Sequence, residues 1–132
     1  MIKIYEKYLL FNKQITIVKL ANRIKDFMND IYPEYKVKVK SGRGSIWIII
    51  NNPRSGIDCW LISLENFYKE IDFTIYTTIL EFFSEELFEF LKNVFEMDTI
   101  SKKLEIEKIK EYIDKLTKDN YKLFINTTKY NL

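Results

Sequence analysis

The chain of 132 residues contains no histidine and a single cysteine, Cys59. Histidine is the most common general base and zinc ligand, so its absence removes serine–histidine and cysteine–histidine catalysis. A single cysteine supplies neither a thiolate zinc cluster nor an intrachain disulfide. Cys59 lies in the apolar run at residues 57–62, which is typical of a buried, unreactive thiol in a reducing compartment.

Carboxylates are the remaining groups that could do chemistry, as in magnesium-dependent nucleases or carboxylate-pair hydrolases. Such sites need acids that converge from strand ends, and the candidates are Asp30, Glu34 and Asp58. Asp30 closes a predicted helix, so this spacing does not predict a shared site. The sequence Gly42-Arg43-Gly44 lies between predicted strands and is typical of a hairpin turn, not of a phosphate loop. We therefore expect no enzymatic activity, no metal site and no cofactor.

Lysines alternate along one predicted strand. Side chains at every second position project from the same face of a strand, about 7 Å apart. This spacing matches successive phosphates of a nucleic-acid strand. The candidate nucleic-acid contacts are Lys36, Lys38, Lys40, Arg43 and Arg54.

The lysine strand has a second interpretation, because lysines on an edge strand also prevent pairing with other chains. RNA recognition would in addition favour exposed aromatic side chains on the sheet. Trp47 and Trp60 instead fall in runs that are typical of buried strands. The lysine pattern therefore predicts nucleic-acid binding only as an alternative.

Acidic residues concentrate in residues 79–98, which hold six acids and one lysine. If a helix starts at Ile79, Phe82 falls on its outer face among glutamates. An exposed aromatic residue with a charged rim resembles the anchor of a protein interface. The other interpretation is that Phe82 packs against the sheet or the last helix, with the acids solvated. The candidate partner-binding residues are Glu81, Phe82, Glu85, Glu86 and Glu89.

These residues must be positioned by helices at both ends of the chain. Apolar residues recur at helical spacing up to Ile31 and predict a helix over residues 14–31. Pro33 disfavours a helical conformation at the preceding residue, so the helix is expected to end there. Residues 2–10 alternate loosely, which leaves open both a short strand and an earlier helical start.

The middle of the chain changes to the two-residue period of strands. Residues 35–40 alternate strictly, and residues 45–51 are typical of a central strand covered on both faces. Further strands are predicted over residues 57–64 and 71–77. Short turns between the runs predict an antiparallel meander of three to four strands.

The C-terminal third returns to helical spacing. One helix starts either after Thr78, which would form a capping box with Glu81, or after Ser84. A last helix is predicted over residues 101–118. Residues 120–132 are expected to form a partly ordered tail.

The elements together predict an α+β fold in a single domain of residues 1–132, with two C-terminal helices packed on one face of the sheet. The 10 Phe and 9 Tyr residues predict a real core. The N-terminus lacks the pattern of a signal peptide, and the longest apolar run, at residues 46–50, is too short for a membrane span. The predicted location is the cytoplasm, with no membrane partner. Abundant Ile, Lys and Asn are typical of an AT-rich genome, such as that of a low-GC bacterium, a phage or a mobile element.

A net charge of +2 produces no global field that selects nucleic acid. With no catalytic site predicted, we expect a small binding or inhibitory protein that acts by protein–protein interaction. Immunity proteins that neutralise toxins and phage-encoded inhibitors have this size. The acidic surface predicts a basic protein partner, and the alternative is a nucleic-acid-binding accessory protein. The sequence leaves open the identity of the partner, the oligomeric state and whether binding inhibits the partner.

Overall fold

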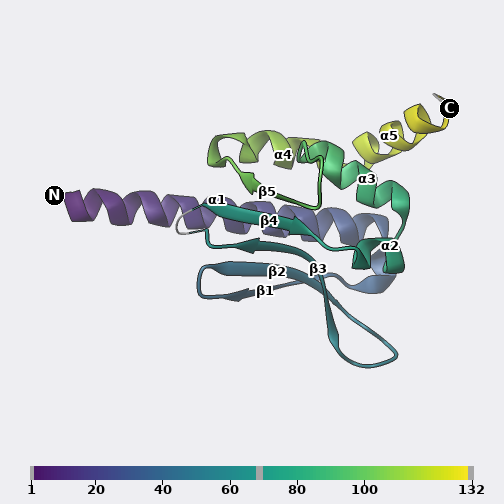
Figure 1. The fold of residues 1–132 in the computed structure, drawn as a ribbon, viewed down its shortest axis with the longest axis horizontal. Coiled ribbons are helices and arrows are strands. Elements are labelled where there is room, and N and C mark those ends of the chain that lie inside the picture. The colour runs from purple at the N-terminus through teal and green to yellow at the C-terminus, as the bar shows by residue number, and fades with distance from the viewer. Residues whose placement is uncertain (1, 68–69, 131–132) are drawn as a thin grey trace.

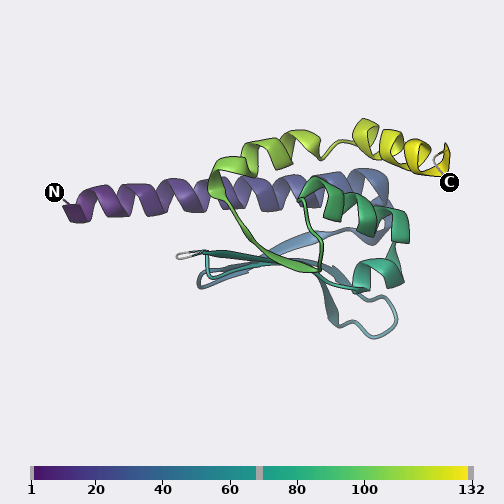
Figure 2. The same ribbon diagram turned by 45° about the horizontal axis from the view of Figure 1, so that its top comes forward.

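A five-stranded antiparallel sheet forms one layer of the molecule, and helices form a second layer on one of its faces (Figure 1, Figure 2). The computed structural model describes the backbone of residues 2–67 and 70–130 and the side chains of residues 13–67 and 70–128. This arrangement confirms the predicted α+β class. The strands are β1 Lys38–Gly42, β2 Ser45–Asn51, β3 Asp58–Glu65, β4 Ile71–Ile75 and β5 Ser101–Leu104. The helices are α1 Ile2–Ile31, α2 Thr78–Phe82, α3 Glu85–Val94, α4 Ile109–Lys115 and α5 Lys118–Tyr130, with short 3-10 helices at Pro33–Tyr35 and Ile106–Lys108.

The long helix α1 runs along the covered face of the sheet (Figure 2). Its core-facing residues recur at helical spacing, which confirms the helix predicted over residues 14–31. The helix begins at Ile2, so residues 2–10 form the earlier helical start and not a strand. It ends at Ile31, two residues before Pro33. The buried side chains of this stripe are Ile17, Leu20, Ala21, Ile24, Phe27 and Met28.

Strand β1 begins at Lys38, three residues later than predicted, because a helix side chain binds the preceding backbone. The Asn29 amide nitrogen donates to the Val37 carbonyl oxygen at 2.9 Å, and its amide oxygen accepts from the Val37 backbone nitrogen at 2.7 Å. Both backbone groups of Val37 are therefore satisfied without a strand partner. Lys36 has a positive φ of 50°, which is incompatible with a regular strand.

The strands follow one another in the sheet in sequence order, and all four adjacent pairs are antiparallel. This confirms the predicted meander through β4. The fifth strand was not predicted: residues 101–104 pair with β4, with Leu104 opposite Ile71 and Ser101 opposite Thr74. The prediction of one helix over residues 101–118 is therefore wrong at residues 101–104, and the remainder of the range contains the 3-10 helix Ile106–Lys108, α4 and the first residue of α5.

Two short helices occupy the region of the two candidate starts: α2 begins at Thr78, one residue before the first candidate start, and α3 begins directly after Ser84. The Ser84 hydroxyl accepts from the Leu87 backbone nitrogen at 3.1 Å and caps α3. Thr78 forms no capping box with Glu81, because its hydroxyl donates instead to the Trp60 carbonyl oxygen. The two short helices replace the single helix that either start alone would have produced.

The core fills the space between the sheet and the helix layer. Phe73 of β4 contacts Phe95, with ring centroids 4.3 Å apart, and Phe95 contacts Tyr112 of α4 at 4.9 Å. Helix α5 spans Lys118–Tyr130 and so includes most of residues 120–132, which were expected to form a partly ordered tail. Tyr121 anchors this helix, because its buried ring packs against Phe90 at 5.2 Å.

Candidate functional site

Helices α1, α3, α4 and α5 lie on one face of the sheet and α2 lies beyond the ends of its strands, so the side chains of the opposite face point away from the helix layer (Figure 2). The strand register identifies this open face. One row of paired residues crosses all five strands, and the rows beside it lie two residues away on each strand, except on β3, where a bulge places Trp60 three residues from the row. The row consists of Lys40, Trp47, Ser63, Thr74 and Ser101.

Three aromatic side chains gather on the open face, and we call Trp47, Trp60 and Tyr76 the aromatic patch. The rings of Trp47 and Trp60 are stacked, with centroids 5.6 Å apart and planes 23° from parallel. Tyr76 meets Trp60 edge-on at 5.9 Å. Trp60 is 45% exposed and Trp47 is half-buried, so the expectation that both are buried is wrong.

A β-bulge brings Trp60 to this face. Ile48 pairs with Ile62, whereas the next residue, Ile49, pairs with Trp60, so β3 contains one extra residue, Leu61. Trp60 and Ser63 are three residues apart and would face opposite sides of a regular strand. The bulge places both on the open face and turns Leu61 into the core.

The patch covers a small apolar core of its own. Ile49 lies on the open face directly opposite Trp60 and two residues from Trp47. Its side chain is only 1% exposed, although it does not belong to the main core cluster. Both faces of the strand predicted over residues 45–51 are therefore covered at Ile49: helices cover one face, and the tryptophans cover part of the other.

Hydrogen bonds hold the patch in place. The hydroxyls of Ser63 and Tyr76 share a hydrogen bond of 3.1 Å beneath it. The indole nitrogen of Trp47 donates to the Glu65 carboxylate at 3.4 Å. The Thr78 hydroxyl at the start of α2 donates to the carbonyl oxygen of Trp60. The patch is therefore built on two strands and tied to the helix that follows them.

Ion pairs on both sides of the patch neutralise its surroundings. Lys40 binds the Asp58 carboxylate, which also accepts from the Asn51 amide at 3.2 Å. These bonds, that from Lys40 first, lower the pKa of Asp58 below its ordinary value. On the β5 side, hydrogen bonds from Asn66 and then Lys103 lower the pKa of Asp72. The open face carries the cations Lys38, Lys40 and Lys103 and the acids Asp58, Glu65 and Asp72.

The predicted cationic residues are only partly brought together. Lys38 and Lys40 project from the open face of β1, whereas Lys36 precedes the strand. Arg43 lies in the turn before β2 and Arg54 in the loop after it, at opposite ends of a strand roughly 20 Å long. The lysine stripe therefore contains two residues and not three.

The predicted acidic surface is divided by the break at Ser84. Glu81 and Phe82 belong to α2, whereas the other three glutamates belong to α3. Phe82 is half-buried and packs against the main core. The remaining glutamates, Glu85, Glu86 and Glu89, are exposed.

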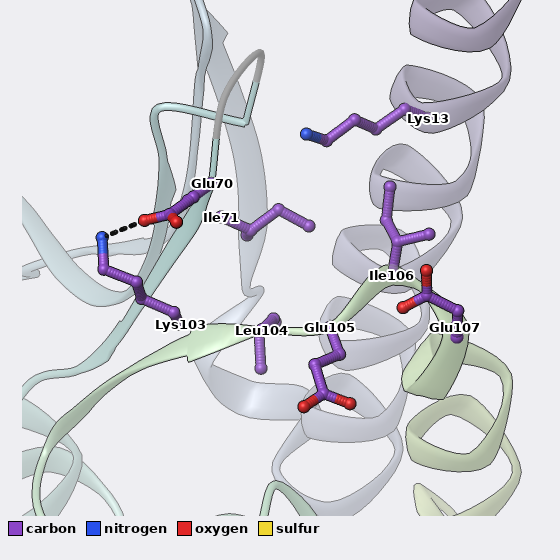
Figure 3. A pocket seen from close by; sticks show the side chains of 8 residues that line it. All are labelled: Lys13, Glu70, Ile71, Lys103, Leu104, Glu105, Ile106 and Glu107. Carbon is purple, nitrogen blue, oxygen red and sulfur yellow. Dashed lines mark ion pairs between the residues drawn. The ribbon is translucent and has the colours of Figure 1, made fainter.

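A further hollow, of about 380 Å³, lies between α1 and the β4–β5 edge (Figure 3). Three of its lining residues are apolar, Ile71, Leu104 and Ile106, and the other five are charged. Lys103 turns to Glu70 at 2.7 Å, and the carboxylates of Glu70, Glu105 and Glu107 point apart in Figure 3. The hollow therefore offers no converging acid pair. Among the side chains that the structure describes, no three His, Cys, Asp or Glu residues are grouped so that they could hold a metal ion.

Sequence reasoning missed the aromatic patch because it took uninterrupted apolar runs as buried strands. One signal was available: Ser63 and Glu65 follow Trp60 on the same strand, and a doubly covered strand would not normally contain them. Of the described helices, none is long and apolar enough to cross a membrane. No family model, curated protein or solved structure matches the chain.

Proposed function

We propose that this chain is a binding protein that holds a protein partner against the open face of its sheet, with the aromatic patch at the centre of the interface. The stacked pair of Trp47 and Trp60 is the observation on which this proposal rests. Tryptophan is enriched in interface centres, where it contributes a large part of the binding free energy. Trp60 exposes 45% of its surface, and a partner would bury it.

The charges around the patch support the same interpretation. Energetically important aromatic residues are typically surrounded by polar groups that exclude water and contribute little themselves. Lys40 with Asp58, and Lys103 with Asp72, form such a polar rim on two sides. Because these charges already neutralise one another, an approaching protein surface need not supply counter-charges.

The patch is also preorganised. Ser63 and Tyr76 share a hydrogen bond, and the bulge at Leu61 fixes the direction of Trp60. A rigid surface loses less conformational entropy when it binds, which favours affinity. The open face therefore has the aromatic centre, polar rim and rigidity of a protein interface.

The experiment begins with a tagged full-length chain used to capture partners from the native host, with identification by mass spectrometry. Affinity for the identified partner is then measured with Trp60→Ala and Trp47→Ala. We expect Trp60→Ala to weaken binding by about 2 kcal/mol or more, as at interface hot spots. If the partner has a measurable activity, stoichiometric addition of the chain tests the inhibitory role.

The matched control is Glu111→Ala, which removes an exposed side chain of α4 on the helix side. Its affinity should equal that of the unaltered chain. Binding is measured at a temperature at which circular dichroism shows every variant to be fully folded. Unaltered affinity of both tryptophan variants would contradict the proposed interface.

Single-stranded nucleic acid is a second candidate ligand, because Lys38 and Lys40 share the face with the patch. Stacking on aromatic rings combined with backbone phosphate contacts is how many proteins bind single strands. The acids of the same face disfavour binding of a nucleic acid, since Asp58 already neutralises Lys40. Titration of tryptophan fluorescence with single-stranded oligonucleotides tests this candidate. Tight binding with a steep salt dependence, flattened by Lys38→Ala with Lys40→Ala, would favour nucleic acid over protein.

A further inference from the structure

Helices α3 and α5 enclose an apolar groove in the helix layer, away from the open face of the sheet. Its volume is about 430 Å³. Side chains of α3 form one wall and side chains of α5 the other. The lining residues are Glu85, Glu86, Glu89, Phe124, Ile125 and Thr128.

The α5 wall of the groove is apolar and only partly covered. Phe124 and Ile125 are half-buried, and the Phe124 ring packs edge-on against Phe90 at 5.6 Å. Leu123, beside them on α5, is 65% exposed and lines a neighbouring hollow of about 320 Å³. Helix α5 therefore presents apolar surface to solvent on a side that no described element covers.

The groove is formed in the free protein because α5 is fixed at its N-terminal end. The Thr117 hydroxyl accepts from the Asn120 backbone nitrogen at 3.1 Å and caps the helix. Tyr121 packs against Phe27 of α1 at 6.0 Å, and its hydroxyl lies 3.5 Å from that of Ser84. Partners therefore meet an existing groove and need not order the helix.

The α3 wall carries uncompensated negative charge. Among the described side chains, none of its three glutamates has an ion-pair partner. The N-terminal dipole of α3 favours acids in its first turn, which accounts for Glu85 and Glu86. Glu89 lies beyond that turn and faces Glu85 four residues away, a like-charge spacing that destabilises a helix. A cationic ligand would remove this repulsion.

From this juxtaposition we infer that the groove binds a basic amphipathic helix of a partner protein. Apolar side chains at helical spacing would contact Phe124 and Ile125, as in other helix-in-groove complexes. Lysines or arginines on the flanks would reach Glu85, Glu86 and Glu89. The groove and the aromatic patch lie in different layers, so this second surface goes beyond the proposed function and stands independently of it.

The test uses three synthetic helical peptides as probes for the full-length chain. One combines leucine with lysine at amphipathic helical spacing, the second replaces every lysine by glutamate, and the third replaces every leucine by serine. Binding is measured by fluorescence anisotropy, and the site is located by amide chemical shifts. We expect only the leucine–lysine peptide to bind, with shifts in α3 and α5.

Variants of the chain separate charge from apolar contact. Glu85→Gln with Glu89→Gln should weaken the leucine–lysine peptide by about tenfold, since it removes two charges of the wall. The matched control is Glu107→Gln with Glu111→Gln, two exposed glutamates also four apart. Ile125→Ser should weaken binding while leaving the charges intact.

The inference is overturned if the leucine–glutamate or serine–lysine peptide binds equally well, because either groove charge or apolar contact would then be irrelevant. It is also overturned if the shifts fall on the aromatic patch or if both glutamine pairs behave alike. Trp60→Ala should leave peptide binding unchanged. Failure of the groove and failure of the open-face interface are therefore distinguishable.

Discussion

The two faces of the sheet are built from the same strands but differ in what covers them. On β4, Phe73 and Ile75 point into the helix layer and are fully buried. Thr74, between them, lies on the open face and shares a hydrogen bond of 3.1 Å with Ser101. Alternation along one strand thus separates a residue that stabilises the fold from one that faces solvent.

The open face departs from this simple division at the aromatic patch. Elsewhere it carries polar and paired side chains, but Trp47 and Trp60 lie over Ile49 and bury it. Apolar area of this kind on a solvent-facing sheet is typical of a surface used for binding. We therefore expect stability to depend mainly on the covered face and recognition to depend on the open one.

The largest change in the free energy of unfolding is expected for a substitution on the covered face. Phe73→Ala should lower the free energy of unfolding by about 3–5 kcal/mol, because it leaves a cavity beside Phe95. Its neighbour Thr74→Ala should cost only about 0.5 kcal/mol, the loss of one exposed hydrogen bond. Urea denaturation of both variants provides the measurement. Similar losses for the two variants would mean that the faces do not differ in this way.

Substitutions in the aromatic patch should change the free energy of unfolding by an intermediate amount. Trp60→Ala is expected to lower the free energy of unfolding by about 1–2 kcal/mol, through loss of the stacked pair and partial exposure of Ile49. Trp60→Phe should retain about half of that contribution. Thermal and urea unfolding give both values. A loss as large as that for Phe73→Ala would show that the open face is part of the main core.

The covered face was largely predictable from the sequence because local periodicity determines it. The spacing of Leu20, Ile24 and Met28 predicts α1, and alternating residues or short apolar runs between turns predict strands β1 to β4. What was missed depends on contacts distant in sequence. Residues 101–104 contain one apolar side chain, Leu104, and become a strand only because β4 offers a free edge.

The candidate site was less predictable for the same reason. Trp60 reaches the open face through a bulge, and no local sequence pattern announced the extra residue at Leu61. Lys36 does not belong to the strand, because the side chain of Asn29 binds the backbone of Val37 and the strand begins only after it. Charge patterns placed residues on expected faces, but pairing between Lys40 and Asp58 required the register of the sheet.

The two sides of the molecule should also respond differently to high pH. Burial raises the pKa of Tyr121, in the helix layer, from 10.0 to about 12. Between these values the unfolded chain releases the proton first, so the free energy of unfolding falls as the pH rises. From pH 10 to 11 the unaltered chain should lose about 1 kcal/mol more than Tyr121→Phe. The free energies of unfolding are measured by urea denaturation at each pH. If they fall equally with pH in the two chains, Tyr121 does not remain protonated in the folded state.

The smallest effect is expected at the rim of the open face. Lys40→Gln removes the principal hydrogen bond that lowers the pKa of Asp58, so this pKa should rise toward its ordinary value of 3.8. Lys38→Gln is the matched control, since Lys38 is only the weakest cause of the same shift. Carbon-detected NMR titration of the Asp58 carboxyl group distinguishes the two variants.

In the unaltered chain the stabilisation from this lowered pKa is present above pH 3.8 and is lost as the pH falls through the folded value. Exposed ion pairs contribute little to folding, because water and salt already screen both charges. We therefore expect Lys40→Gln to leave urea denaturation at neutral pH unchanged while it moves the Asp58 titration. A clear loss of stability at neutral pH would show that the ion pair of Lys40 and Asp58 stabilises the sheet. The open face would then contribute to folding at β1 as well as to binding.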